Sequence, residues 1–245
     1  MSDIYMEPLG EQAIIIRFGT VIDQNTHEKV RKFAAWMDRF PIPGMVEYIP
    51  AYTTVTVFYD PLAVMDGKRL DPHTQDQMLS PYERVKRMLH EALEQSSDIR
   101  PAAGNIVEIP VLYGGEMGPD LAEVAAYHQI SEEEVIRIHS QGEYQVFMIG
   151  FAPGFPYIGG MSEKIATPRK KSPRLRIPSG SVGIAGTQTG IYPLETPGGW
   201  QIIGRSPVSL FRPNHNPPSL LQAGDYVRFI PISREAYEAY KEEES

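Results

Sequence analysis

Cysteine is absent from the 245 residues of this sequence. Its absence excludes disulfide bonds, thiol nucleophiles, and zinc or iron–sulfur sites that depend on cysteine ligands. A chain without thiols agrees with a reducing compartment.

Long hydrophobic runs are also missing. The longest apolar stretch, residues 146–155, is shorter than the roughly 20 residues of a membrane-spanning helix and is interrupted by Pro153. Residues 1–7 have neither the cationic start nor the apolar stretch of a secretory signal. We therefore expect a cytoplasmic protein with no part in the membrane.

Basic residues are fewer than acidic residues in this sequence. The chain has 23 Lys and Arg side chains against 31 Asp and Glu, and a formal net charge of −8. Such a chain repels a polyphosphate backbone, so we expect no nucleic-acid partner.

The familiar signatures of catalysis are absent as well. The sequence has no P-loop, no nucleophile elbow and no His-Glu-x-x-His pair, and its six histidines are scattered. Gly180, Gly183 and Gly186 are evenly spaced but do not form a dinucleotide fingerprint. These patterns assign no metal site and no catalytic residue.

Strand and helix patterns alternate over the first part of the chain. A capping box of Ser80 and Glu83, with Pro81 at the first helical position, marks the start of one helix. The predicted elements are a strand at 13–18, a helix at 25–40, strands at 46–49 and 53–59, a helix from 80, and a strand at Ile106–Tyr113. This βαββαβ order is typical of the ferredoxin-like sandwich, an α+β fold whose antiparallel sheet carries both helices on one face.

Two irregular segments interrupt these patterns. Residues 60–80 are polar and rich in turn formers, which predicts a surface loop. Residues 96–105 contain Pro101 and Gly104 and predict the domain boundary. We therefore divide the chain into a small α/β domain, residues 1–100, and a second domain, residues 101–245.

The second domain begins with two short helical patterns, at 120–128 and 131–140, and ends with a polar helical pattern at 233–245. Between them, residues 142–231 hold 13 of the 21 glycines and 12 of the 22 prolines. Short strands joined by turns tolerate this density, whereas long helices do not. Strands are predicted at 145–150, 181–185, 200–204, 208–211 and 226–231. Their spacing predicts a mainly β domain with a closed or nearly closed barrel.

An aromatic loop follows the first of these strands. Phe151, Phe155 and Tyr157 alternate with Pro153 and Pro156. The prolines fix the backbone, and the rings could either plug one end of a barrel or form an apolar wall for a small ring or a partner's side chain.

A basic loop follows, with Arg169, Lys170, Lys171, Arg174 and Arg176 within eight positions of an acidic protein. Three prolines stiffen this loop. It could be a solvated surface loop, or it could bind an anion, because arginine forks suit carboxylate and phosphate groups.

A third irregular segment, residues 190–200, contains Glu195 and Trp200. Glu195 could be exposed in a hairpin turn, or its apolar neighbours could adapt it for proton transfer. Because barrels build their sites from the loops at strand ends, we expect all three segments to share one cleft or one continuous surface. The predicted substrate-binding residues are Phe155, Tyr157, Arg169, Arg174, Arg176, Glu195 and Trp200.

Six motifs in their present order resemble the allophanate hydrolase subunit 1 family. They lie at residues 113–121, 150–157, 168–169, 178–182, 192–200 and 223–229. Each motif alone is weak, but the ordered set spans nearly the whole chain. The resemblance implies a cyclophilin-like β barrel in the second half, preceded by a smaller α/β domain.

The resemblance also implies a role that depends on other proteins. Family members of this length pair with a subunit 2 protein, and in ATP-dependent 5-oxoprolinase they work with a third, lactam-opening component. The implied function is a hydrolase subunit that is active only in complex, converting 5-oxoproline to L-glutamate, with ATP as cofactor of the complex. Two alternatives remain: an inhibitor of a sporulation sensor histidine kinase, as in the KipI-like branch, and a carboxyltransferase component of a urea or allophanate pathway.

Overall fold

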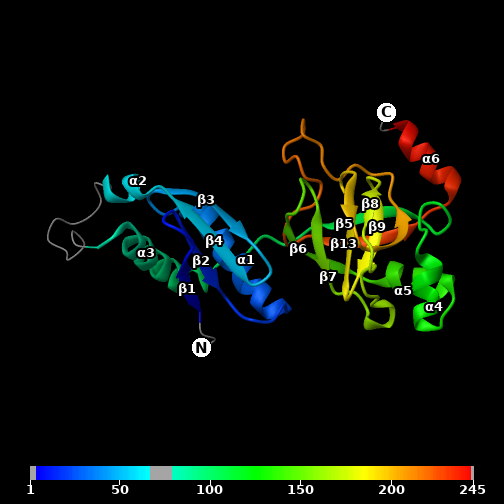
Figure 1. The fold of residues 1–245 in the computed structure, drawn as a ribbon. Helices are drawn as coiled ribbons and strands as arrows, with labels where there is room; N and C mark the ends of the chain where they lie inside the picture. Colours follow the sequence, from blue (N-terminus) through cyan, green and yellow to red (C-terminus); the bar gives the residue numbers. More distant parts are fainter. Residues whose placement is uncertain (1–3, 67–78, 244–245) are drawn as a thin grey trace. The chain divides into compact units, whose positions relative to one another are not determined.

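The computed structural model describes residues 4–66 and 79–243 (Figure 1). The chain divides into two compact units, Met1–Ala102 and Ala103–Ser245. The division falls within the segment 96–105 that contains Pro101 and Gly104.

The smaller unit is a four-stranded antiparallel sheet in the order β1-β2-β4-β3. Its elements are β1 (Tyr5–Pro8), β2 (Ala13–Arg17), α1 (Gln24–Arg39), β3 (Met45–Pro50), β4 (Thr54–Tyr59), α2 (Pro61–Asp66) and α3 (Pro81–Ser96).

One face of this sheet carries both long helices. Val55 and Val57 alternate along β4 and are fully buried against Phe33 of α1 and Leu89 of α3. At the start of α3, the backbone N–H of Glu83 donates a hydrogen bond to the Ser80 hydroxyl, and the backbone N–H of Ser80 donates one to the Glu83 carboxylate. The predicted capping box is therefore confirmed. The alternation and the helical spacing thus build one core between sheet and helices.

The predicted ferredoxin-like arrangement is not confirmed, because its last strand is elsewhere. Ile106–Tyr113 is a strand, β5, as predicted. It does not join the small sheet, however, because it pairs in parallel with a strand of the larger unit that lies about 120 residues later in the chain. The edge beside β2 is occupied instead by β1, a four-residue strand that no sequence pattern predicted. The loop prediction is wrong at Pro61–Asp66, which forms α2, and residues 67–78 lie outside the described part of the chain.

The larger unit is built on a closed barrel of seven strands in the order β10-β7-β6-β13-β5-β12-β9, so the predicted barrel is confirmed. The barrel strands are β5 (Ile106–Tyr113), β6 (Tyr144–Ile149), β7 (Pro156–Gly159), β9 (Ser181–Ala185), β10 (Gln188–Ile191), β12 (Gln201–Arg205) and β13 (Tyr226–Pro231). Closure leaves none of these strands at an open sheet edge.

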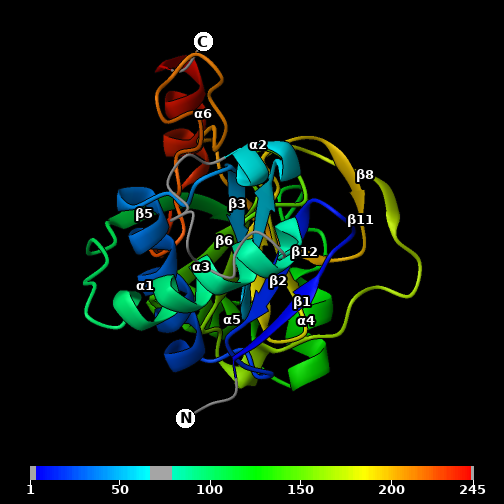
Figure 2. The ribbon, with the colours of Figure 1, turned by 90° about the vertical axis from the view of Figure 1, so that its left-hand side faces the viewer.

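Other elements surround this barrel. The short strands β8 (Arg174–Ile177) and β11 (Thr196–Gly198) form a separate ribbon, which projects to one side in Figure 2. Helices α4 (Leu121–His128) and α5 (Glu132–Gln141) lie beside the lower half of the barrel, at the right in Figure 1, and α6 (Arg234–Glu243) lies at its upper right. Within residues 4–66 and 79–243, no helix combines the length and apolar character needed to cross a membrane.

The strand predicted at 208–211 is wrong. Only an isolated bridge between Phe211 and Ser219 occurs there. Pro207 precedes the segment and Pro213 follows it, and because neither has a backbone N–H, a ladder cannot extend beyond either end of these four residues.

Candidate functional site

A cavity of about 220 Å³ opens where the aromatic loop, the basic loop and the 190–200 segment meet. We call it the aromatic cavity. Its lining residues are Phe151, Phe155, Tyr157, Arg169, Tyr192, Pro197, Gly198, Gly199 and Trp200.

Phe155 is the centre of the aromatic wall and is only 3% exposed. Its ring centroid lies 5.1 Å from that of Tyr157, 5.7 Å from Tyr192 and 5.9 Å from Trp200, each time edge to face. Gly190 makes room for the indole, because a Cβ there would lie 3.0 Å from Trp200 Cζ3. Edge-to-face pairs of this kind each stabilise the wall by roughly 0.5–1.5 kcal/mol beyond the burial of their surface.

Phe151 stands at the rim of the cavity in an unusual conformation. Its φ is +67°, and 67% of the residue is exposed. Its ring lies 5.3 Å from Phe155. A left-handed conformation costs a non-glycine residue roughly 1–2 kcal/mol, and such strain is concentrated at functional sites. Phe155 is therefore buried while Phe151 is open to solvent, and the choice between a barrel plug and a binding wall stays a prediction.

Arg169 supplies the positive charge of the cavity. Its guanidinium carbon lies 5.9 Å from the Trp200 ring centroid, within cation–π range. Within the described residues Arg169 pairs with no carboxylate, so its donors are available to a ligand. Burial raises the pKa of Tyr192 to about 12, although the nearby charge of Arg169 works in the opposite direction.

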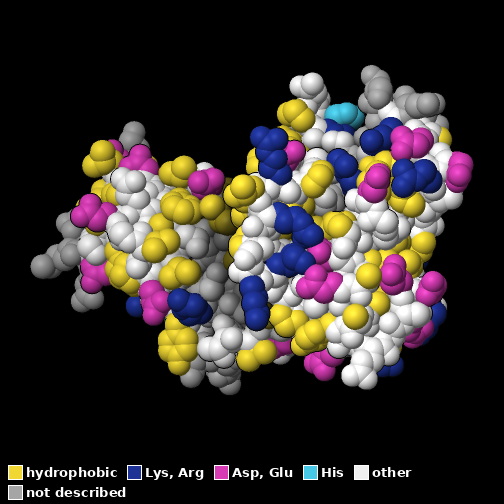
Figure 3. All heavy atoms as spheres, turned by 45° about the vertical axis from the view of Figure 1, so that its right-hand side comes forward, with side chains coloured by type: hydrophobic (Ala, Val, Ile, Leu, Met, Phe, Trp, Pro, Cys, Tyr) yellow, Lys and Arg dark blue, Asp and Glu magenta, His cyan; other side chains and the backbone are white. Residues whose placement is uncertain are grey.

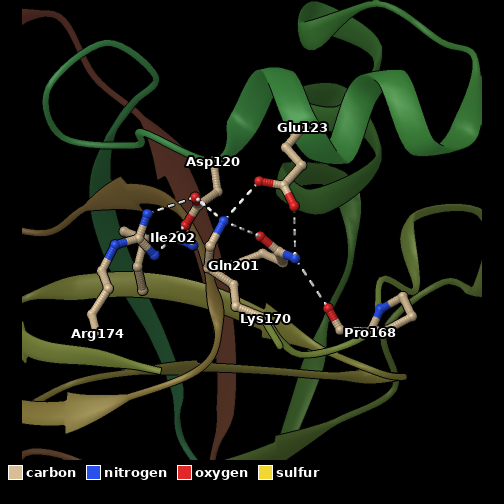
Figure 4. A network of polar contacts seen from close by, with 7 residues as sticks. All are labelled: Asp120, Glu123, Pro168, Lys170, Arg174, Gln201 and Ile202. Carbon is tan, nitrogen blue, oxygen red and sulfur yellow. Dashed lines mark hydrogen bonds and ion pairs between the residues drawn. The ribbon is translucent and has the colours of Figure 1, made fainter. Parts of the chain in front are cut away.

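Asp120, which is nearly buried, takes up two other cations of the basic loop (Figure 4). The Arg174 fork donates to both Asp120 oxygens, each at 2.7 Å, and Lys170 Nζ lies 2.9 Å from Oδ1. The backbone N–H of Ile202 donates to Oδ2 at 2.6 Å. Burial alone would raise the pKa of Asp120, but these donors outweigh it and hold that pKa below its ordinary value.

A second carboxylate completes this polar network. Glu123 on α4 accepts from Lys170 Nζ at 2.7 Å, and the Gln201 amide donates to the Pro168 carbonyl at 3.1 Å. Both contacts are visible in Figure 4. The basic loop is therefore held to α4 and β12, and it is not the freely solvated loop that composition alone would allow.

The predicted site residues fall into two groups. Phe155, Tyr157, Arg169 and Trp200 line the aromatic cavity, whereas Arg174, Arg176 and Glu195 do not. The second group thus lies outside this cavity, and a continuous surface shared with the first group stays a prediction. That the first group binds a substrate stays a prediction.

Arg174, Arg176 and Glu195 lie outside the aromatic cavity because each pairs with an oppositely charged side chain elsewhere. Arg174 points its fork at Asp120 instead of at the cavity. Arg176 lies 3.7 Å from Glu195, with side chains 82% and 56% exposed. Glu195 is therefore the exposed turn carboxylate of the two predicted alternatives. On the face in Figure 3, Lys and Arg side chains likewise lie directly beside Asp and Glu.

The sequence reasoning missed Asp120, Tyr192 and Gln201. Asp120 directly precedes α4 and looks like a helix cap, yet its side chain makes no capping hydrogen bond. Tyr192 lies within the predicted 190–200 segment and Gln201 directly follows it, but neither carries a charge that would single it out. In the described part of the chain, no three His, Asp or Glu side chains gather closely enough to hold a metal ion.

Comparison with known proteins matches residues 4–221 to the model of the carboxyltransferase domain, subdomains C and D. The chain is 54% identical over 238 residues to a 5-oxoprolinase subunit of Bacillus subtilis, covering 97% of each protein. It is 40% identical over 223 residues to the corresponding 5-oxoprolinase subunit of Escherichia coli, covering 91% of this chain and 94% of that protein. The crystal structure of TTHA0988 superposes with a TM-score of 0.74 at 34% identity, covering 91% of this chain and 40% of that larger one.

Proposed function

Because the chain belongs to the family of carboxyltransferase domains, subdomains C and D, with subunits of 5-oxoprolinase among its relatives, we propose that it is a component of that enzyme. In this role it would help to convert 5-oxoproline to L-glutamate with ATP, acting only in complex. The observation that carries the proposal is the aromatic cavity with Arg169 in its wall, an arginine that has no carboxylate partner among the described residues.

5-Oxoproline is a small ring that bears one carboxylate, and the cavity suits both features. At about 220 Å³ it is smaller than the roughly 300–1,000 Å³ of pockets for drug-sized ligands, which favours a single small ring. Phe155 and Trp200 would pack against that ring. Arg169 would bind the carboxylate with two parallel hydrogen bonds, as arginine forks do.

The same volume argues against ATP in this cavity. We propose that the nucleotide is bound elsewhere in a complex with two further 5-oxoprolinase components. One is the allophanate hydrolase subunit 2 homologue, and the other is the lactam-opening component. The strained, exposed Phe151 at the cavity rim is then a candidate contact for a partner.

Reconstitution tests this assignment. The chain is co-purified with the subunit 2 homologue and the lactam-opening component, and glutamate formed from 5-oxoproline and ATP is measured. We expect turnover from the full complex and none when this chain is omitted. A full complex that forms no glutamate would refute the assignment.

Arg169→Ala tests the role of the cavity within that complex. Loss of a charge-assisted contact typically costs about 1.5–3 kcal/mol, so kcat/KM for 5-oxoproline should fall roughly ten- to a hundredfold. Arg176→Ala is the matched control, because it removes an exposed arginine outside the cavity and should leave kcat/KM within about twofold. Equal effects of the two substitutions would contradict the role of Arg169.

A carboxyltransferase role is the second candidate, and the description of the family favours it. Carboxyl transfer to urea by the same complex, without glutamate formation, would decide for this candidate. Inhibition of a sensor histidine kinase stays a prediction, which a phosphorylation assay with the purified chain would test.

A further inference from the structure

We propose that Asp120 is a positioning residue that fixes the positions of Arg169 and Trp200 relative to each other in the wall of the aromatic cavity. The proposal rests on the proposed function, because it assigns Arg169 to the carboxylate of the ligand. Asp120 does not line the cavity and would act only through the two segments that it joins.

Asp120 connects the two segments that carry the cation and the indole. Lys170 immediately follows Arg169, and its ammonium group binds Asp120 Oδ1. Ile202 lies two residues after Trp200, and its backbone N–H binds Asp120 Oδ2. One nearly buried carboxylate therefore bridges the basic loop and the start of β12.

The backbone on both sides of Arg169 is also held. The carbonyl of Pro168 accepts from the Gln201 amide at 3.1 Å, and the N–H of Lys170 donates to the Gly199 carbonyl at 2.7 Å. The Arg169 side chain itself contacts the Trp200 ring. A fixed backbone with available guanidinium donors is the arrangement that loses little entropy when an anion binds.

The segment that precedes α4 places Asp120 beside β12. The N–H of Asp120 donates to the Ile202 carbonyl at 2.9 Å, and Gly114 N–H donates to the Ile203 carbonyl at 3.0 Å. A Cβ on Gly118 would lie 2.1 Å from that same Ile203 carbonyl oxygen, so only glycine permits this approach. Backbone contacts, separate from the two cations, thus place Asp120 beside β12.

The network also sets how many positive charges without a counter-charge are available to a ligand in the aromatic cavity. Lys170 and Arg174 are balanced by Asp120 and Glu123, whereas Arg169 has no such partner among the described residues. Without Asp120, two cations next to the cavity would lose their counter-charge. We infer that Asp120 leaves the cavity with a single available positive charge, which matches a ligand with one carboxylate.

Asp120→Asn in the reconstituted complex tests the proposal, since it removes the charge and keeps the shape. KM for 5-oxoproline should rise about tenfold, with a smaller change in kcat. In an Arg169→Ala background the same substitution should change KM by less than about twofold, because its effect passes through Arg169. Glu143→Gln, which neutralises a half-exposed carboxylate paired with Arg228 outside the network, is the control and should leave KM within about twofold. Additive effects of Asp120→Asn and Arg169→Ala, or an unchanged KM, would overturn the proposal.

A second measurement needs no activity and separates this proposal from the proposed function. In a Trp36→Phe background, Trp200 is the only indole, and acrylamide quenching reports its exposure. Asp120→Asn should increase the quenching constant of Trp200 at least about twofold, because Ile202 and Lys170 are released. Lys170→Met tests the same link from the loop side and should act in the same direction. Unchanged quenching in both variants would refute the positioning role, even in a complex that makes glutamate.

Discussion

Asp120 and His139 are both buried polar groups of the barrel unit, yet Asp120 is ionised and His139 is neutral. Asp120 lies between the barrel and the basic loop, where charged donors keep it ionised and its pKa below the ordinary value. His139 is fully buried among barrel side chains, and burial lowers its pKa from 6.5 to about 3.

The partners of His139 explain the difference. Tyr113 Oη lies 2.7 Å from Nδ1, and Thr189 Oγ1 lies 2.8 Å from Nε2. The Thr189 hydroxyl donates to the Gly183 carbonyl, so it accepts from Nε2–H, and Nδ1 accepts from the Tyr113 hydroxyl. This arrangement satisfies a neutral imidazole. Burial alone keeps His139 neutral, whereas at Asp120 the charged donors outweigh burial and keep the carboxylate ionised.

Acid should have the largest effect, through His139. A histidine whose pKa is depressed in the folded state stabilises the fold above pH 6.5 and loses that contribution as the pH falls toward 3. We expect the free energy of unfolding to fall by roughly 1 kcal/mol per pH unit over this window. Urea unfolding at several pH values measures this slope.

His139→Gln should flatten the slope, because an amide can make both hydrogen bonds without titrating. His90→Gln, which replaces an exposed histidine, is the control and should keep the parent's slope. Tyr113 and Tyr144 do not contribute in acid, since burial raises the pKa of both. A parent-like slope in His139→Gln would show that His139 is not the acid-sensitive group.

Asp120→Ala should have the next largest effect, because it removes the counter-charge of Lys170 and Arg174 together. Breaking a buried ion pair costs about 3–5 kcal/mol, and the partial exposure of both cations favours the lower end. Urea unfolding at pH 7 measures the change. A loss below about 1 kcal/mol would mean that water replaces the carboxylate at little cost.

The Arg176–Glu195 pair should have the smallest effect. The same two charge types meet there in solvent, 3.7 Å apart. Glu195→Gln should change the free energy of unfolding by less than about 0.5 kcal/mol, which is typical of surface pairs. A change as large as that of Asp120→Ala would remove the distinction between the buried and exposed pairs.

Patterns within one element were predicted well from the sequence. The capping box at Ser80, the alternation along β4 and the glycine- and proline-rich texture of the barrel each depend on neighbouring residues. Pairing between distant segments was not predictable in the same way. β5 has a clear strand pattern, but nothing in that pattern shows that its partner is β13 instead of β2.

The candidate site shows the same difference between local patterns, which the sequence reveals, and contacts between distant segments, which it does not. The local clustering of rings and cations identified Phe155, Tyr157, Arg169 and Trp200 as residues of interest. Clustering could not separate Arg169 from Arg174, because both are arginines in one proline-rich stretch of sequence, and only the structure shows that Arg174 begins strand β8.

Local residue patterns were enough to locate most strands, helices and the two loops, because these depend on contacts within a few residues. Which cation stays available was settled only by the folded chain. Asp120 lies 54 positions before Arg174, and it reaches that side chain only after Gly118 lets the preceding loop pack on β12. A charge is neutralised by what lies within a few ångströms in space, and distance along the chain does not report that.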